Sequence, residues 1–131
     1  MFKSLLIATA ITSALSAGSV LADTQAPKTA IYAITADGSK YYADANGMTL
    51  YTFDKDAKGV SNCNGGCAEK WPPLMAAANA RKTGDFTVIT RADGSKQWAY
   101  DGMALYTWFK DKARGDMTGD GVKGVWHVAK P

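Results

Sequence analysis

Short apolar runs divide the chain into segments with the length and composition of β-strands. The runs AIYAITA (30–36) and FTVITRA (86–92) are rich in β-branched and aromatic residues, and each leads into an Asp-Gly pair. Each pair is followed by a second run, SKYYADA (39–45) or SKQWAYD (95–101). Two such runs joined through Asp-Gly predict one β-hairpin in each half of the chain.

A third run follows each predicted hairpin, MTLYTF (48–53) in the first half and MALYTWF (103–109) in the second. The run GVWHVA (124–129) supplies a closing strand. Helical signal is weak, because only GCAEKW (66–71) and PLMAAANARK (73–82) could form a turn or two. We therefore expect an all-β fold, mainly antiparallel, with at most one or two short helices.

The two halves of the chain repeat each other. GMTLYTFDKD, which begins at Gly47, recurs as GMALYTWFKD, which begins at Gly102, an offset of 55 residues. The same offset carries Trp71 onto Trp126, so the register holds beyond the motif. A duplicated sequence indicates a duplicated structural unit, and we expect two pseudosymmetric repeats packed as a sandwich or small barrel.

Strand periodicity places the motif residues on two faces. Met48 and Leu50 point to the face opposite Tyr51. In the second copy, Met103 and Leu105 point to the face opposite Tyr106. Large apolar groups on both faces indicate strands buried on both sides, which favours core packing. Paired methionines could instead hold a soft metal such as Cu(I), so Met48, Met103 and His127 are the candidate metal ligands.

The N-terminal segment is typical of a secretory signal peptide. Lys3 precedes an apolar run that ends in small residues at Ala22, and we expect cleavage after Ala22. Residues 23–30 then form a flexible leader. The apolar run is too short and too often interrupted for a membrane span, and no cysteine precedes Cys63 to carry a lipid anchor. We therefore expect a periplasmic or secreted protein.

Removal of residues 1–22 from 131 would leave 109, enough for one modest domain. We assign that domain to residues 31–131, with repeats at about 31–76 and 86–131. Without Lys3 the chain carries 14 basic and 12 acidic residues, interspersed along the sequence. That balance does not favour binding to nucleic acid or to a membrane surface.

Asp56 and Asp111 each lie five residues after a motif tyrosine, Tyr51 or Tyr106, beyond the predicted strand end. Each is followed by a glycine within a few residues, so we expect its carboxylate to accept backbone N–H groups within a turn. The alternative is a carboxylate pair that acts as acid and base, but nothing in the spacing brings the two copies together.

Cys63 and Cys67 are the two cysteines of the chain, and an oxidising compartment favours a disulfide between them. So short a loop gains little chain entropy from closure, so the bond would mainly shape the loop. A thiol oxidoreductase would use Cys-x-x-Cys, haem attachment needs Cys-x-x-Cys-His, and zinc needs more ligands than His127. A lone histidine on a strand is usually solvated or hydrogen-bonded and supports no triad.

The two Tyr-x4-Asp elements, Tyr51 with Asp56 and Tyr106 with Asp111, occur together with CNGGCAEKWPPL and GVWHVAKP. This combination resembles the bacterial family of secreted and lipoprotein repeats named for that motif. The resemblance covers essentially the whole mature chain and implies no settled activity. Many members resemble lipoproteins, and this chain departs from them because it lacks the lipid-bearing cysteine.

No residues form a convincing catalytic set, so we do not expect an enzyme or a cofactor. We expect an exported, non-catalytic periplasmic or secreted module that binds a protein or a small ligand. The alternative is a redox- or metal-linked periplasmic protein that uses copper or thiol chemistry at Cys63, Cys67 and the methionines. The two copies differ in the Cys63–Cys67 loop and the His127 strand, so a specific function is expected there.

Overall fold

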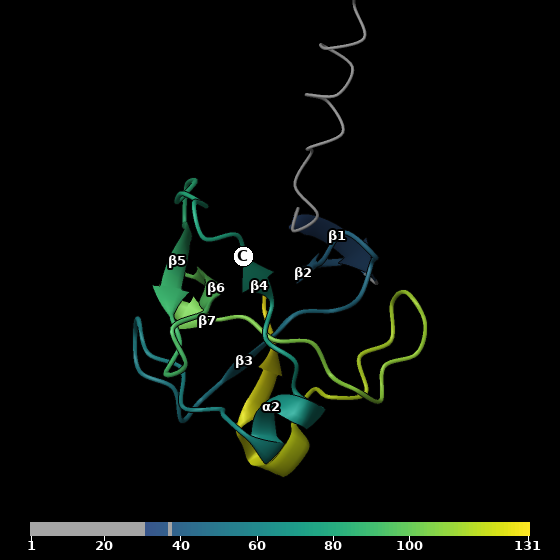
Figure 1. The fold of residues 1–131 in the computed structure, drawn as a ribbon. Coiled ribbons are helices and arrows are strands. Elements are labelled where there is room, and N and C mark those ends of the chain that lie inside the picture. Colours follow the sequence, from purple (N-terminus) through teal and green to yellow (C-terminus); the bar gives the residue numbers. More distant parts are fainter. Residues whose placement is uncertain (1–30, 37) are drawn as a thin grey trace, which may run out of the picture.

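The computed structural model describes residues 31–36 and 38–131 (Figure 1). The expected signal peptide and leader, and Asp37 of the first turn, lie outside these residues. The described chain contains helix α2 (Gly66–Lys70) and the 3₁₀ turn η1 (Val122–Gly124). Its strands are β1 (Tyr32–Ala36), β2 (Ser39–Ala43), β3 (Tyr51–Phe53), β4 (Met75–Ala76), β5 (Phe86–Thr90), β6 (Lys96–Tyr100), β7 (Met103–Ala104) and β8 (Trp126–Val128).

All the strand pairs are antiparallel, and they form three small sheets. β1 pairs with β2, β3 with β8, and β6 with β4, β5 and β7. Both predicted hairpins form, and in the second the Arg91 N–H donates to the Ser95 carbonyl at 2.8 Å around Gly94 at φ 90°. The prediction of a mainly antiparallel β fold is confirmed, but the strands of the described region do not close into a barrel.

The two helix expectations have different outcomes. α2 forms within GCAEKW, as expected. The expectation of a helical turn in PLMAAANARK is wrong, because the segment begins extended and contributes β4. Leu74 explains the difference: its N–H donates to the Leu105 carbonyl at 2.9 Å and its carbonyl accepts the Trp98 N–H at 2.8 Å. These partners from the other repeat take the hydrogen bonds that a helix would have used.

The third strand of each repeat crosses to the other repeat. β3 of the first repeat pairs with β8 of the second, with Phe53 opposite Trp126. In the second repeat, the equivalent segment pairs with the prolines of the first, and the Thr107 N–H donates to the Pro72 carbonyl at 2.8 Å. Pro72 and Pro73 have no N–H, so this ladder stays one-sided and no regular strand forms there. Each repeat therefore supplies backbone partners to the third run of the other repeat.

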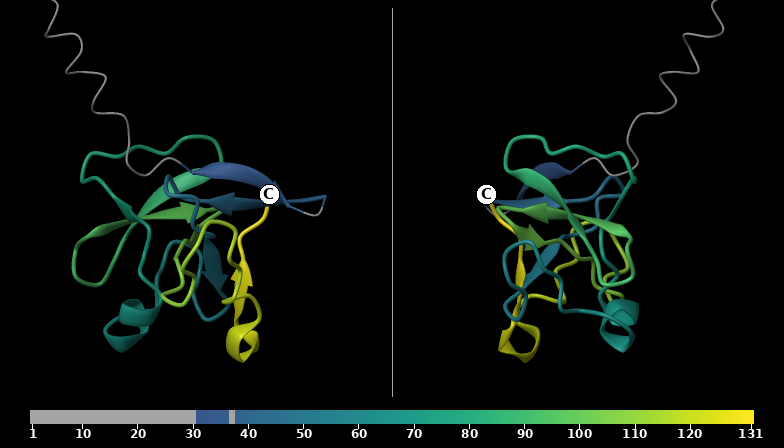
Figure 2. Two further views of the ribbon diagram at one scale, coloured as in Figure 1. Left: turned by 90° about the vertical axis from the view of Figure 1, so that its right-hand side faces the viewer. Right: turned by 60° about the vertical axis from the view of Figure 1, so that its left-hand side comes forward.

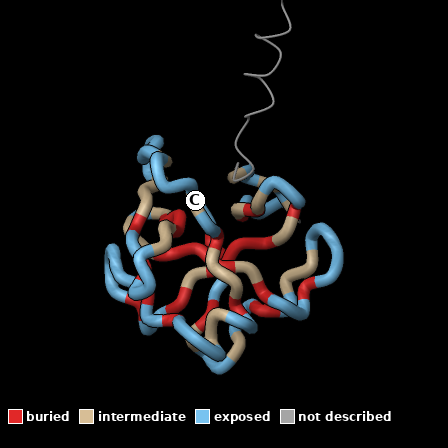
Figure 3. Tube along the Cα trace, in the orientation of Figure 1, coloured by how far each residue is buried: buried red, intermediate tan, exposed pale blue. Residues whose placement is uncertain are grey.

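Two buried clusters lie on opposite sides of the crossing strands, where the tube in Figure 3 is mostly red. One contains Leu50 and Leu105, and the other contains Tyr51 and Tyr106. The predicted assignment of these residues to two faces, each buried, is confirmed. Figure 2 shows α2 and η1 at one end of the molecule and the β1–β2 hairpin at the opposite end. In the described part of the chain, neither helix has the length and apolar character needed to cross a membrane.

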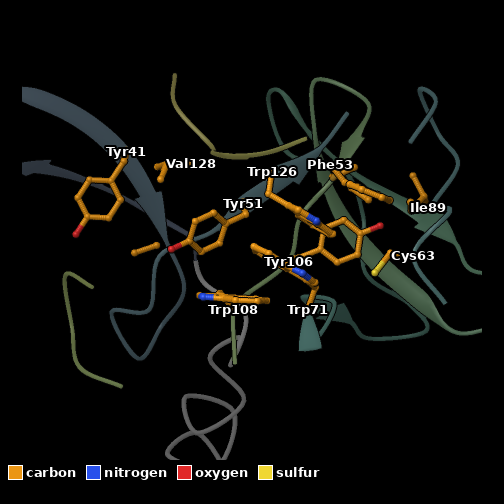
Figure 4. Close-up of a cluster of buried hydrophobic side chains, with 13 residues drawn as sticks. Tyr41, Tyr51, Phe53, Cys63, Trp71, Ile89, Tyr106, Trp108, Trp126 and Val128 are labelled. Carbon is orange, nitrogen blue, oxygen red and sulfur yellow. The ribbon is translucent and has the colours of Figure 1, made fainter. Parts of the chain in front are cut away.

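Four aromatic rings form a continuous stack at the centre of the second cluster (Figure 4). Phe53 and Trp126 are 4.1 Å apart between ring centroids, and Trp126 and Trp71 are 3.7 Å apart with planes at 2°. Trp71 and Trp108 follow at 3.9 Å. The repeat offset of 55 residues relates the two inner rings, Trp71 and Trp126, to each other. It also relates the two outer rings, Phe53 and Trp108. A local two-fold axis therefore passes between Trp71 and Trp126.

Gly119 packs directly on this stack, and enlarging it should destabilise the fold. A Cβ at Gly119 would lie 2.8 Å from Cη2 of Trp71 and 3.0 Å from Cγ of Trp108. We expect Gly119→Ala to lower the free energy of unfolding by about 1–3 kcal/mol, the usual cost of overpacking. Urea denaturation measures this change.

Gly66→Ala is the matched control, because a Cβ at Gly66 meets no atom within 4 Å. Its denaturation midpoint should stay close to that of the unmodified protein. Equal midpoints for the Gly119 and Gly66 variants would contradict tight packing of the stack.

Candidate functional site

The motif tyrosines bind the motif aspartates of the opposite repeat. The Tyr51 hydroxyl donates to Oδ2 of Asp111 at 2.6 Å, and the Tyr106 hydroxyl donates to Oδ2 of Asp56 at 2.7 Å. The two tyrosines also bind each other through the main chain, with N–H to carbonyl distances of 2.8 and 3.0 Å. Both tyrosine side chains are fully buried. This exchange could not be predicted, because the spacing within one repeat gives no sign of it.

The predicted turn role of the aspartates is also present. Oδ1 of Asp56 accepts the Asn62 N–H at 2.6 Å, and Oδ1 of Asp111 accepts the Thr118 N–H at 2.9 Å and its hydroxyl at 2.7 Å. Each carboxylate therefore fixes the start of the loop that follows it. Donors engage both oxygens of each carboxylate, so Asp56 and Asp111 each bind their own loop and a tyrosine of the other repeat.

The two hydrogen-bond networks differ at their outer ends. On one side the Gly119 N–H donates to the Tyr51 hydroxyl oxygen at 3.2 Å. On the other side Ser61 Oγ lies 2.6 Å from the Tyr106 hydroxyl and accepts from the buried guanidinium of Arg91 at 3.1 Å. Arg91 also donates to the Cys63 carbonyl at 2.8 Å. Arg91 thereby ties the cysteine loop to the second hairpin, a contact that the sequence analysis did not predict.

Burial raises the pKa of both motif tyrosines, and the hydrogen-bonded aspartates add to the effect. Burial also raises the pKa of Asp56, an effect that the Asn62 N–H, the Tyr106 hydroxyl and the Arg91 charge oppose. The phenols therefore keep their protons at neutral pH and act as donors to the carboxylates.

A cavity of about 440 Å³ lies beside the aromatic stack and is lined in part by residues of α2 and η1. All four rings of the stack contribute to its wall. The remaining lining residues come from both repeats and are Lys55, Gly66, Cys67, Lys70, Val122, Lys123 and Val125. The cavity therefore exists only where the two repeats meet.

The stacking determines which part of each ring can reach the cavity. Trp71 lies between Trp126 and Trp108, and Trp126 lies between Phe53 and Trp71, so both faces of both rings are covered. Tyr51 and Tyr106 meet these rings edge-on at centroid distances of 5.3 and 5.2 Å. Only the remaining ring edges of Trp71 and Trp126 can line the cavity.

The predicted disulfide between Cys63 and Cys67 forms, with an S–S distance of 2.02 Å. Cys63 is fully buried in the aromatic cluster (Figure 4), whereas Cys67 is half-buried and lies in the cavity wall. The repeat offset places Thr118 and Val122 at the equivalent positions. The second copy fixes its loop with the Thr118 hydrogen bonds where the first copy has a covalent crosslink.

The candidate metal ligands lie on different elements. Met48 follows an Asp44 turn before β3, Met103 lies in β7, and His127 lies in β8. Nε2 of His127 is 2.8 Å from Oδ2 of Asp54, and this pair is solvent-exposed. Within residues 31–36 and 38–131, no three or more His, Cys, Asp or Glu side chains are grouped so that they could hold a metal ion.

The chain belongs to a family described as a secreted repeat of unknown function. The sequence model of this family matches the chain twice, at residues 32–75 and 87–130. Each match contains one Tyr-x4-Asp motif and one tryptophan of the inner stacked pair. Searches of curated proteins and of solved structures found no significant match.

Removing either motif hydroxyl should destabilise the fold. Tyr51→Phe leaves Asp111 without one donor and the Gly119 N–H without its acceptor, while Tyr106→Phe removes a donor from Asp56. We expect each change to lower the free energy of unfolding by about 1.5–3 kcal/mol, the usual worth of a hydrogen bond to a charged group. Chemical denaturation measures the loss. Tyr32→Phe, at a position that is 53% exposed, should be neutral.

The raised tyrosine pKa values predict loss of stability at alkaline pH. Above about pH 10 the tyrosines of the unfolded chain ionise, while Tyr51 and Tyr106 in the folded protein remain neutral. Their stabilising contribution is complete below that pH and decreases as the pH rises. The slope should be up to about 1.4 kcal/mol per pH unit for each tyrosine.

Denaturation midpoints measured across the alkaline range test this dependence. The Tyr106→Phe variant should show a shallower decline than the unmodified protein. Identical slopes would mean that the buried phenol does not cause the loss.

Proposed function

We propose that this member of the secreted repeat family is an exported, non-catalytic binding module that holds a small ligand in the cavity between its repeats. The cavity itself is the observation that carries the proposal. Its volume of about 440 Å³ falls within the range of small-molecule sites, and its wall combines aromatic rings with a few charged groups.

The position of the cavity supports a role in binding. Both repeats contribute to its wall, and the residues that complete it differ between the copies: Cys67 is matched by Val122, and Lys70 by Val125. A wall with different chemistry on its two sides can hold a ligand in one orientation. The duplicated scaffold thus provides one asymmetric site.

The chemistry of the site favours binding over catalysis. The ionisable side chains that line it are lysines, and the buried carboxylates Asp56 and Asp111 are engaged by tyrosines and backbone N–H groups. We infer that the protein acts in the periplasm or outside the cell after cleavage near Ala22. The family description and the N-terminal sequence both support this location.

A second candidate is thiol–disulfide chemistry, because Cys67 lies in the cavity wall. Equilibration with glutathione redox buffers separates the two functions. A structural disulfide stays oxidised down to about −300 mV, whereas catalytic disulfides are reduced at about −120 to −270 mV. Reduction in the latter range, with the fold intact, would favour the thiol function.

Binding can be tested with the four tryptophans as reporters. The test uses a set of one- and two-ring aromatic compounds, equally divided among neutral, anionic and cationic members. We expect some of them to shift the indole N–H signals of Trp71, Trp108 and Trp126 in ¹⁵N NMR spectra. Trp98 belongs to the other buried cluster and should not respond. If no compound shifts the three signals selectively, the proposed function is wrong.

A blocked cavity provides the control. Gly66 lines the cavity and has open space around its Cβ position, so Gly66→Phe should fill the site without disturbing the core. We expect this variant to lose the shifts, while Gly66→Ala should retain them. Unchanged binding by the phenylalanine variant would place the ligand elsewhere.

A further inference from the structure

Three lysines are among the residues that line the cavity, and they give it a positive charge. Lys55 follows β3, Lys70 ends α2, and Lys123 lies in η1, so three separate segments bring them to one site. Among the described residues, none of the three takes part in an ion pair. No Asp or Glu is part of the described cavity wall. The acidic neighbour Asp54 is hydrogen-bonded to His127.

The two central rings of the aromatic wall present positive potential to the cavity, as the lysines do. An aromatic ring carries negative potential on its faces and positive potential at its edge. The faces of Trp71 and Trp126 are covered within the stack, so these rings offer the cavity only their edges. Sites for quaternary ammonium groups use open aromatic faces, which the two central rings do not present. The two central rings therefore offer a cation no open face.

Lys123 adopts a backbone conformation that lysine rarely takes. Its φ is 53°, in the left-handed region, and the flanking glycines Gly121 and Gly124 also have positive φ values of 82° and 71°. Such conformations persist in non-glycine residues where the surrounding structure enforces them, and they are concentrated at ligand sites. A glycine would fit this position without strain, yet the chain places a charged side chain there, in the cavity wall.

We propose that the ligand is a flat organic anion: an aromatic or conjugated molecule of one or two rings that carries a carboxylate. The carboxylate meets the lysine ammonium groups, and the ring lies against the edges of the stacked tryptophans. The volume of about 440 Å³ sets the size of the molecule. This inference rests on the proposed binding function and adds the charge and shape of the ligand.

Three probes of equal ring size test the charge preference. We expect 2-naphthoate to bind more tightly than the neutral 2-naphthylmethanol, and (2-naphthylmethyl)trimethylammonium to bind most weakly, as measured by calorimetry and by the indole N–H shifts. Higher ionic strength should weaken 2-naphthoate binding and leave the neutral probe unaffected.

Substitutions that remove one positive charge at a time identify the lysines responsible for the preference for an anion. We expect a two- to five-fold loss of 2-naphthoate affinity, about the range for solvent-accessible charge pairs, in each of the variants Lys55→Gln, Lys70→Gln and Lys123→Gln. The affinity for the neutral probe should not change. Lys110→Gln is the matched control, since Lys110 is the repeat equivalent of Lys55. Lys110 lies near the Phe109 ring, at 5.7 Å from its centroid, and not in the cavity wall.

The outcomes separate this inference from the proposed function. If the cationic or neutral probe binds as tightly as 2-naphthoate, the ligand is not selected as an anion, but the cavity remains a binding site. Equal weakening by Lys110→Gln and the cavity variants would show a general charge effect and also overturn the inference. If no probe binds but another compound of the larger set shifts the three indole signals, only the inference is wrong. If neither the probes nor the set shifts them, the proposed function is wrong as well.

Discussion

Two buried hydrogen bonds between a phenol and a carboxylate hold this fold together, and each one joins the two repeats. An ionised carboxylate can be buried only where donors replace the water that it loses. Asp56 obtains one donor from its own loop and another from Tyr106 of the other repeat, and Asp111 is served in the same way by Tyr51. Neither repeat can bury its own aspartate alone. The crossing strands bring each tyrosine to the aspartate of the other repeat, and the same crossing places Phe53 opposite Trp126 in the shared stack.

The hairpins and the repeat register could be predicted from the sequence because their signals are local or periodic. An Asp-Gly pair between β-rich runs specifies a hairpin, and the match of Trp71 with Trp126 fixes the register over long distances. The exchange of tyrosines and aspartates could not be predicted in this way, because Tyr51 and Asp56 are as close in sequence as a local pair would be. Their actual partners lie 60 and 50 residues away.

Competition for backbone hydrogen bonds explains the departures from the predicted elements. The third run of each repeat changes partner at nearly every residue: the Leu50 N–H donates to Tyr42 and the Tyr51 N–H to Tyr106. Such a run forms few consecutive ladder bonds, so β3 is only three residues long. A specific function at the His127 strand stays a prediction. Trp126 of this strand belongs to the stack, whereas His127 faces outward to Asp54.

The rings that form the cavity wall also form the core, which links binding to stability. Trp71 and Trp126 are only 4% and 3% exposed, so replacing either would damage the fold before it reported on a ligand. The lysines are exposed at the edge of the same stack and can be changed without opening the core. Under the proposed function, a ligand in the cavity contacts both repeats and raises the free energy of unfolding by about 2.7 kcal/mol at one hundred times its dissociation constant. The duplicated motif thus builds the scaffold, and two of the three lysines that charge the shared cavity, Lys70 and Lys123, have no lysine at the equivalent position of the other copy.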